Sequence, residues 1–134
     1  MTGVLMRIFL ALIFITTLVA CFPNNPVKMS MTANPLANTP EVTAAGRAVF
    51  EQRCQMCHGV EGRGDGPAAA ALASKPANLR SLNHKPEGLI AMRIIGGGKV
   101  MPAWKGILTE EEIWQVARYI KTISTEEART LANK

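Results

Sequence analysis

The sequence predicts a small all-α protein with three to five short helices. Apolar residues recur at helical spacing in three separate segments, and start or stop signals for helices flank these segments. Runs of β-branched residues are rare, and no strand of useful length is apparent. With 134 residues, the chain has room for one domain. Much of the apolar content lies in one N-terminal run, so the remaining core is thin and favours support by a disulfide, a metal or a bound cofactor.

Residues 1–20 have the pattern of an export signal. Arg7 is the only charged residue before an apolar stretch at 8–20, which is short for a membrane span of roughly 20 residues. The stretch ends in the tetrapeptide LVAC at 18–21, which resembles the cleavage box of bacterial lipoproteins. We therefore expect Cys21 to be lipid-modified and to tether the domain to the membrane on its periplasmic side. The alternative is an uncleaved anchor helix that begins near Val4.

Residues 21–40 are expected to form the anchor cysteine and a flexible linker, and 41–134 the folded domain. Prolines and asparagines fill this linker, which has almost no charge and no hydrophobic periodicity. The formal net charge of the chain is +5, yet no basic run or aromatic-interleaved patch indicates nucleic-acid binding. The small positive net charge favours binding to acidic proteins or to anionic lipid.

The domain is expected to open with a helix at 41–53. Its apolar side carries Ala45, Val49 and Phe50, and its polar side carries Arg47, Glu51 and Arg53. Residues 54–68 contain five glycines or prolines and are expected to be mostly loop. A short Ala-rich helix is expected at 68–73.

Two further helices complete the domain. One opens at Pro86, carries Leu89, Ile90, Ile94 and Ile95, and is stopped by three glycines at 96–98. The last begins after Thr109, which can form a capping box with Glu112. Its apolar face comprises Ile113, Val116, Ala117, Ile120 and Ile123.

The motif most informative about chemistry is Cys54-Gln55-Met56-Cys57-His58. Two thiols three residues apart at the end of a helix face the same way and can add to the two vinyl groups of a haem. The adjacent His58 can then offer its imidazole nitrogen to the iron. The motif predicts one covalently bound haem c per chain.

Three other uses of this motif were open from the residues alone. A thioredoxin-like dithiol needs a strand before it and a helix after it, whereas a helix precedes and a glycine-rich loop follows here. A structural zinc site needs four ligands, but the only other histidine is His84 and Cys21 lies beyond the linker. A plain disulfide between Cys54 and Cys57 is the simplest alternative in an exported protein.

Around this motif, the chain resembles the class I c-type cytochromes, especially their short bacterial members. The resemblance covers most of 42–123. It rests on Gly46, Phe50, 54–59, GRGDGP at 62–67, KPANL at 75–79, MPAW at 101–104 and 113–119. It implies a small cytochrome c fold in which short helices wrap around the haem. The first and last helices are expected to cross where Gly46 and Phe50 meet Val116 and Tyr119.

Met101 is expected to be the second axial ligand of the iron. It follows a glycine run that frees the backbone and precedes Pro102, which restricts it to an extended conformation. The resemblance implies the same assignment, because a Met-Pro pair at this position supplies the axial thioether in the family. Met56 cannot reach the opposite face of the haem, and Met92 is expected to pack within a helix. His84 is the rival ligand, although a surface loop position is expected for it.

The resemblance also implies supporting residues in the haem pocket. A ligating imidazole normally donates its other N–H to a carbonyl. The family supplies that carbonyl from a proline after the motif, which points to Pro67. Trp104 is expected to close the pocket, and an ordinary core position is its alternative. Arg80 could pair with a haem propionate.

Iron that has both a histidine and a methionine ligand has no open position, which favours outer-sphere electron transfer. We therefore expect an electron carrier with no small-molecule substrate rather than an enzyme. Its redox partners would be a dehydrogenase or quinol-oxidising complex as donor and an oxidase or reductase as acceptor. Lys99, Lys105 and Arg63 could form a docking rim for an acidic partner. The alternatives are a fixed haem c subunit of an oxidoreductase complex and a haem sensor with a labile sixth ligand.

Overall fold

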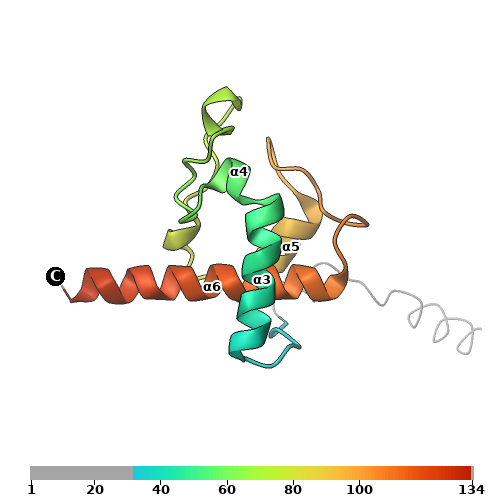
Figure 1. Ribbon diagram of the computed structural model, residues 1–134, viewed down its shortest axis with the longest axis vertical. Coiled ribbons are helices and arrows are strands. Elements are labelled where there is room, and N and C mark those ends of the chain that lie inside the picture. The colour runs from blue at the N-terminus through green and yellow to red at the C-terminus, as the bar shows by residue number, and fades with distance from the viewer. Residues whose placement is uncertain (1–31, 134) are drawn as a thin grey trace, which may run out of the picture.

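The computed structural model describes residues 32–133, which fold into α-helices joined by turns and loops (Figure 1). The elements in chain order are α3 (Pro40–Arg53), α4 (Gln55–His58), the 3-10 turns η1 (Ala69–Ala71) and η2 (Leu79–Ser81), α5 (Glu87–Gly96) and α6 (Glu110–Ala132). No strand occurs within this range, so the predicted all-α class is confirmed. The expected export signal, Cys21 and the linker up to residue 31 lie outside the described residues. None of the helices between 32 and 133 is both long and apolar enough to cross a bilayer.

Helix α3 begins where the sequence provides an N-cap. Thr39 is extended, with ψ of 157°, and its side-chain oxygen accepts a hydrogen bond from the backbone N–H of Val42 at 3.4 Å. Pro40 takes the first helical position, where the missing N–H would have no helical partner in any case. The helix ends at Arg53, which confirms the prediction of a helix at 41–53 to within one residue.

Helices α3 and α6 cross in close contact, as expected from Gly46 and Phe50 (Figure 1). A Cβ atom on Gly46 would lie 2.0 Å from the carbonyl oxygen of Gln115, so only glycine allows this approach. Beside it, the rings of Phe50 and Tyr119 pack with centroids 5.3 Å apart. The crossing fixes the C-terminal end of α3, which leads into the two cysteines, relative to α6.

Helix α6 begins with the predicted capping box. The Thr109 hydroxyl accepts from the backbone N–H of Glu112 at 3.2 Å, and the Glu112 carboxylate accepts from the backbone N–H of Thr109 at 2.7 Å. The expected apolar face is buried, with Ile113, Val116, Ala117, Ile120 and Ile123 each less than 9% exposed. Side chains from α5 and η2 complete the core: Ile90, Ala91, Ile94 and Leu79. Each fully buried Ile or Leu side chain stabilises the fold by about 1.5–3 kcal/mol.

The segment 54–73 differs from its prediction. Residues 55–58, expected to be loop, form the single turn α4, in which the backbone N–H of His58 donates to the carbonyl of Cys54 at 2.9 Å. The Ala-rich stretch at 68–73 forms only the short turn η1 rather than a helix, because the backbone becomes extended at Leu72, whose ψ is 146°. Alanine favours a helix, but Leu72 instead lines the pocket described below.

The expected linker reached Pro40, whereas its described part, 32–39, is attached to the domain. The side-chain amide of Asn34 donates to Glu87 at 2.6 Å and to the backbone carbonyl of Trp114 at 3.0 Å. Leu36 packs against the core, and its carbonyl accepts from Arg118 at 3.3 Å. The ordered domain therefore begins earlier than residue 41. We call residues 34–36 the strap.

Candidate functional site

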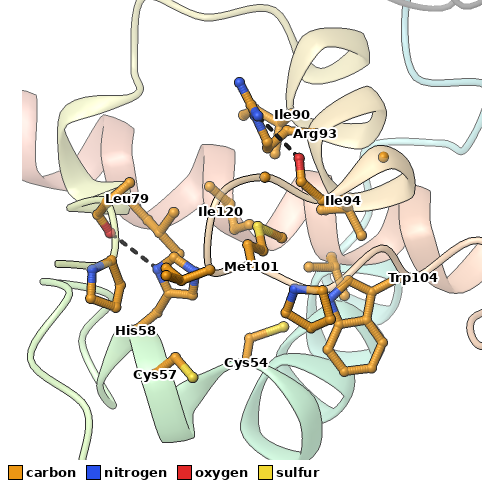
Figure 2. Close-up of a pocket in the computed structure, with 18 of the residues that line it drawn as sticks. Cys54, Cys57, His58, Leu79, Ile90, Arg93, Ile94, Met101, Trp104 and Ile120 are labelled. Atoms are coloured by element: carbon orange, nitrogen blue, oxygen red, sulfur yellow. Dashed lines mark hydrogen bonds between the residues drawn. The ribbon is translucent and has the colours of Figure 1, made fainter. Parts of the chain in front are cut away.

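A pocket of about 770 Å³ lies beside the α3–α4 junction (Figure 2). Its wall is completed by the loop around Pro76, by α5, and by the loop that carries Met101 and Trp104. Most of the lining is apolar, and the core residues Phe50, Ile90, Ile94, Val116 and Ile120 reach it from inside. The volume is within the range typical of cofactor pockets.

Cys54 and Cys57 lie on the wall formed by the α3–α4 junction, as the motif predicted (Figure 2). Both thiols are free, so the structure contains no disulfide between them. Burial, together with the neighbouring Cys57, raises the pKa of the Cys54 thiol to about 11. Redox-active dithiols work with a lowered pKa, so this arrangement argues against the thioredoxin-like alternative.

His58 is buried and extends into the pocket from the end of α4 (Figure 2). Its Nδ1 lies 3.1 Å from the carbonyl oxygen of Ala77. With Nδ1 protonated and donating to this carbonyl, Nε2 carries the free lone pair of the neutral ring. Burial lowers the pKa of His58, although the bond to Ala77 acts in the opposite direction. The side chain is therefore suited to bind a metal ion through Nε2.

The prediction that Pro67 supplies this carbonyl is wrong. Pro67 is exposed and does not line the pocket. Its neighbours explain why: the backbone N–H of Gly66 donates to the carbonyl of Cys57 at 3.2 Å, and that of Ala68 donates to Met56 at 2.9 Å. These bonds hold Pro67 against the outer side of α4. The sequence signal for the correct residue was the KPANL segment at 75–79, which places Ala77 directly after a proline.

Met101 lines the same pocket as His58, from the loop that follows α5 (Figure 2). The loop turns back because Gly97 has φ of 66°, and a Cβ atom there would lie 2.6 Å from the carbonyl oxygen of Met101. The backbone N–H of Gly98 donates to that carbonyl at 2.9 Å. Two rivals are placed differently: Met56 is 59% exposed, and the exposed His84 does not line the pocket. Met92, expected to pack within its helix, also lines the pocket.

Trp104 lines the pocket next to the Met101 loop, as expected (Figure 2). Its backbone N–H donates to the carbonyl of Ile94 at 3.1 Å, which ties the loop to α5. Arg80 does not line the pocket and instead donates to Glu127, so the expected pairing with a haem propionate is not supported. Its position in η2, facing α6, explains this difference.

The pocket has a cationic lining. Five basic side chains contribute to it, and none of its described lining residues is acidic: the basic residues are Arg53, Lys75, Lys85, Arg93 and Lys99. Lys99 belonged to the expected docking rim. Lys105 is exposed but does not line the pocket, and Arg63 pairs with Glu61 at 2.8 Å. Of the three residues expected in the docking rim, Lys99 alone lines the pocket, and the sequence prediction did not include the other four basic lining residues.

These residues fit a covalently bound haem. Two thiols, an imidazole with a free Nε2 and a thioether line a single apolar pocket, and the cationic lining matches the two propionates of a haem. Within 32–133, no cluster of three or more His, Cys, Asp or Glu side chains is arranged to hold a metal ion.

Comparisons with known proteins agree with this geometry. Residues 41–120 match the family model described as cytochrome c oxidase, cbb3-type, subunit III. Cytochrome c6 of Leptolyngbya boryana is 32% identical over 77 residues, which cover 58% of this chain and 87% of that protein. Cytochrome c6 of Euglena gracilis is 36% identical over 78 residues, which cover 58% and 87%.

Among solved structures, the chain is similar to one from the Kuenenia stuttgartiensis reducing HAO-like protein complex Kustc0457/Kustc0458. The TM-score is 0.60 and the sequence identity 30%. The match covers 66% of this chain and 46% of the other, so the present chain spans less than half the length of that neighbour.

Proposed function

Because this chain belongs to the class I c-type cytochromes, whose cofactor is covalently bound haem c, we propose that it is a monohaem electron carrier with histidine and methionine ligation of the iron. In this proposal Cys54 and Cys57 form the thioether links, and His58 and Met101 are the axial ligands. The observation that supports it best is that one pocket gathers all four side chains. Bound haem c supplies reversible one-electron exchange at the iron, and a thioether ligand raises its potential relative to two histidines.

The residues of the pocket have distinct roles in this proposal. His58 presents Nε2 to the metal, while Ala77 holds its Nδ1 proton and fixes the ring orientation. Met101 would hold the metal from the loop that follows α5, and a haem c bound by both side chains would have no open site for a substrate. The apolar lining excludes water and disfavours the extra positive charge of the oxidised iron. The site can therefore pass an electron without making or breaking a bond.

We propose an exported, periplasm-facing location with a lipid anchor at Cys21. The apolar stretch at 8–20 and the tetrapeptide at 18–21 support it. Mass spectrometry of the membrane fraction tests this location. A chain that starts at Cys21 and carries a diacylglycerol adduct is the expected result, and an intact chain starting at Met1 contradicts it.

We propose acidic redox proteins as partners. The five basic side chains around the pocket, with no acidic one among its described lining residues, favour a negatively charged docking surface. The association rate with such a partner falls as the ionic strength rises. An association rate that is insensitive to salt contradicts this part of the proposal.

A second candidate is a fixed haem c subunit of a larger assembly. It is favoured by the similarity to a chain from a protein complex. Purification in mild detergent separates the two candidates. A stable complex with other subunits supports the fixed subunit, and a free monohaem protein supports the carrier.

The main test of the proposed function is spectroscopic. A reduced-minus-oxidised spectrum and a pyridine haemochrome of the purified protein are expected to show one haem with two thioether links. Rapid binding of carbon monoxide by the reduced protein at neutral pH would instead indicate a labile sixth ligand, as in a haem sensor. A colourless protein would contradict both the electron carrier and the haem sensor.

A further inference from the structure

Glu127 links two loops to the C-terminal half of α6. Its Oε2 accepts hydrogen bonds from Nε of Arg80 at 2.9 Å and from Nη2 at 2.5 Å. Its Oε1 lies 3.7 Å from Nη1 of Arg63. The side chains of Arg80 and Glu127 are 18% and 22% exposed, so water screens their interaction only in part. In Figure 1 the chain between α4 and α5 passes beside this half of α6.

The loops that carry Arg63 and Arg80 are locked to each other. The backbone N–H of Leu79 donates to the carbonyl of Gly62 at 2.7 Å. A Cβ atom on Gly64, which has φ of 76°, would lie 2.3 Å from the carbonyl oxygen of Pro76, so the two backbones touch. The segments 62–64 and 76–80 therefore form one unit, and Glu127 ties this unit to α6.

Ala77, the partner of His58, belongs to that unit. Ala77 is exposed, so packing of the Ala77 side chain does not hold the Ala77 carbonyl in place. Its position depends on its neighbours: the buried Pro76, Leu79, and the ion pair of Arg80. The pair between Arg63 and Glu61 cannot replace Glu127, because it lies within one loop and is 45% and 62% exposed.

We infer that Glu127 is a positioning residue that holds the Ala77 carbonyl against Nδ1 of His58 and thereby sets how strongly His58 donates to the iron. This inference rests on the proposed function, in which His58 is an axial ligand. An imidazole whose N–H is well hydrogen-bonded is a more basic ligand, and a more basic ligand stabilises oxidised iron. Loss of the Glu127 contact lets the loops move, weakens the bond to Ala77 and raises the reduction potential.

The test compares Glu127→Gln with Glu126→Gln in the full-length holoprotein. Each variant removes one negative charge at adjacent positions of α6, but Glu126 is exposed. Glu126→Gln controls for the loss of one charge from α6, and the exchange rates separate loss of the Glu127 contact from the weaker screening of the Glu127 charge. NMR of the reduced protein measures solvent exchange of the His58 Nδ1 proton and of the Leu79 amide, and a redox titration gives the potential. A pyridine haemochrome checks the covalent haem separately.

Glu127→Gln is expected to accelerate both exchange rates several-fold and to raise the potential more than Glu126→Gln does. Adding Arg80→Gln to Glu127→Gln should change little further, since both residues act through one contact. Equal exchange rates and equal potentials in the two single variants overturn the inference. If Glu127→Gln does not fold, Arg80→Lys replaces it in the comparison with Glu126→Gln. This variant keeps the positive charge at position 80 but loses the paired hydrogen bonds to Glu127. If no thioether-linked haem is found, the proposed function fails, while exchange of the Leu79 amide still decides whether Glu127 holds the loops.

Discussion

The backbone of Gly46 in α3 lies so close to the carbonyl of Gln115 in α6 that a Cβ atom would sit 2.0 Å from its oxygen. This contact sets the angle between the two longest described helices and therefore the position of the cysteine-bearing end of α3.

Gly46→Ala is expected to destabilise the protein by about 1–3 kcal/mol, because the helices must move apart to admit the methyl group. Thermal unfolding monitored by circular dichroism measures the change. Gly96→Ala is the matched control, since a Cβ atom at this helical position meets nothing within 4 Å. A loss of stability in the control as large as in Gly46→Ala would contradict this explanation.

Met101→Ala is expected to abolish the weak absorption band near the red edge that accompanies methionine binding to oxidised haem iron, and to lower the potential. The absorption spectrum of the oxidised protein is the measurement. Met92→Ala and His84→Ala are controls: the first lines the same pocket and the second lies outside it. A band that survives in Met101→Ala and disappears in either control reassigns the ligand.

Cys57→Ala is expected to leave the haem attached through Cys54 alone, which shifts the pyridine haemochrome band to longer wavelength because one vinyl group remains unsaturated. Cys21→Ser should leave the haemochrome unchanged and abolish lipidation. An unchanged haemochrome in Cys57→Ala would show that this thiol is not part of the attachment.

Acidification is expected to weaken the start of α6. Hydrogen bonds from the backbone and side chain of Thr109 lower the pKa of Glu112 from its ordinary value of 4.5. A carboxylate whose pKa is lower in the folded state stabilises above the unfolded pKa, and this contribution disappears as the pH falls through the folded pKa. Glu112→Gln should therefore reduce the pH dependence of unfolding below about pH 4.5. Equal pH dependence in the variant and the parent chain contradicts the assignment.

Asn34→Ala is expected to cost about 1–2 kcal/mol of stability, because it removes the hydrogen bonds to Glu87 and to the backbone carbonyl of Trp114. Thermal unfolding at neutral pH measures this cost. Asn38→Ala, at an exposed position of the same segment, is the control. No difference between the two would mean that the strap contributes nothing to stability.

The sequence predicted those features that local chemistry determines. Thr109 and Glu112 are three residues apart, and the capping box they form needs nothing else from the fold. The same holds for the helix that ends at Arg53, where the spacing of apolar residues was sufficient. The haem motif was equally local, and its two cysteines and histidine do line one pocket.

Features that depend on distant backbone atoms could not be predicted. The partner of His58 is a main-chain carbonyl, which any residue could provide, so the KPANL segment at 75–79 did not by itself identify Ala77. The contact between Arg80 and Glu127 spans 47 residues. The amide of Asn34 reaches Trp114 across 80 residues, and composition alone made its segment resemble a linker.

The strap precedes α3 in the chain, whereas Cys54 follows the C-terminal end of this helix. A helix of 14 residues is about 21 Å long. The whole of α3 thus separates the strap from the cysteines along the chain, and the strap is held by Glu87 and Trp114, neither of which lines the pocket. A change in the strap can therefore alter the stability of the domain without touching the side chains that would hold haem.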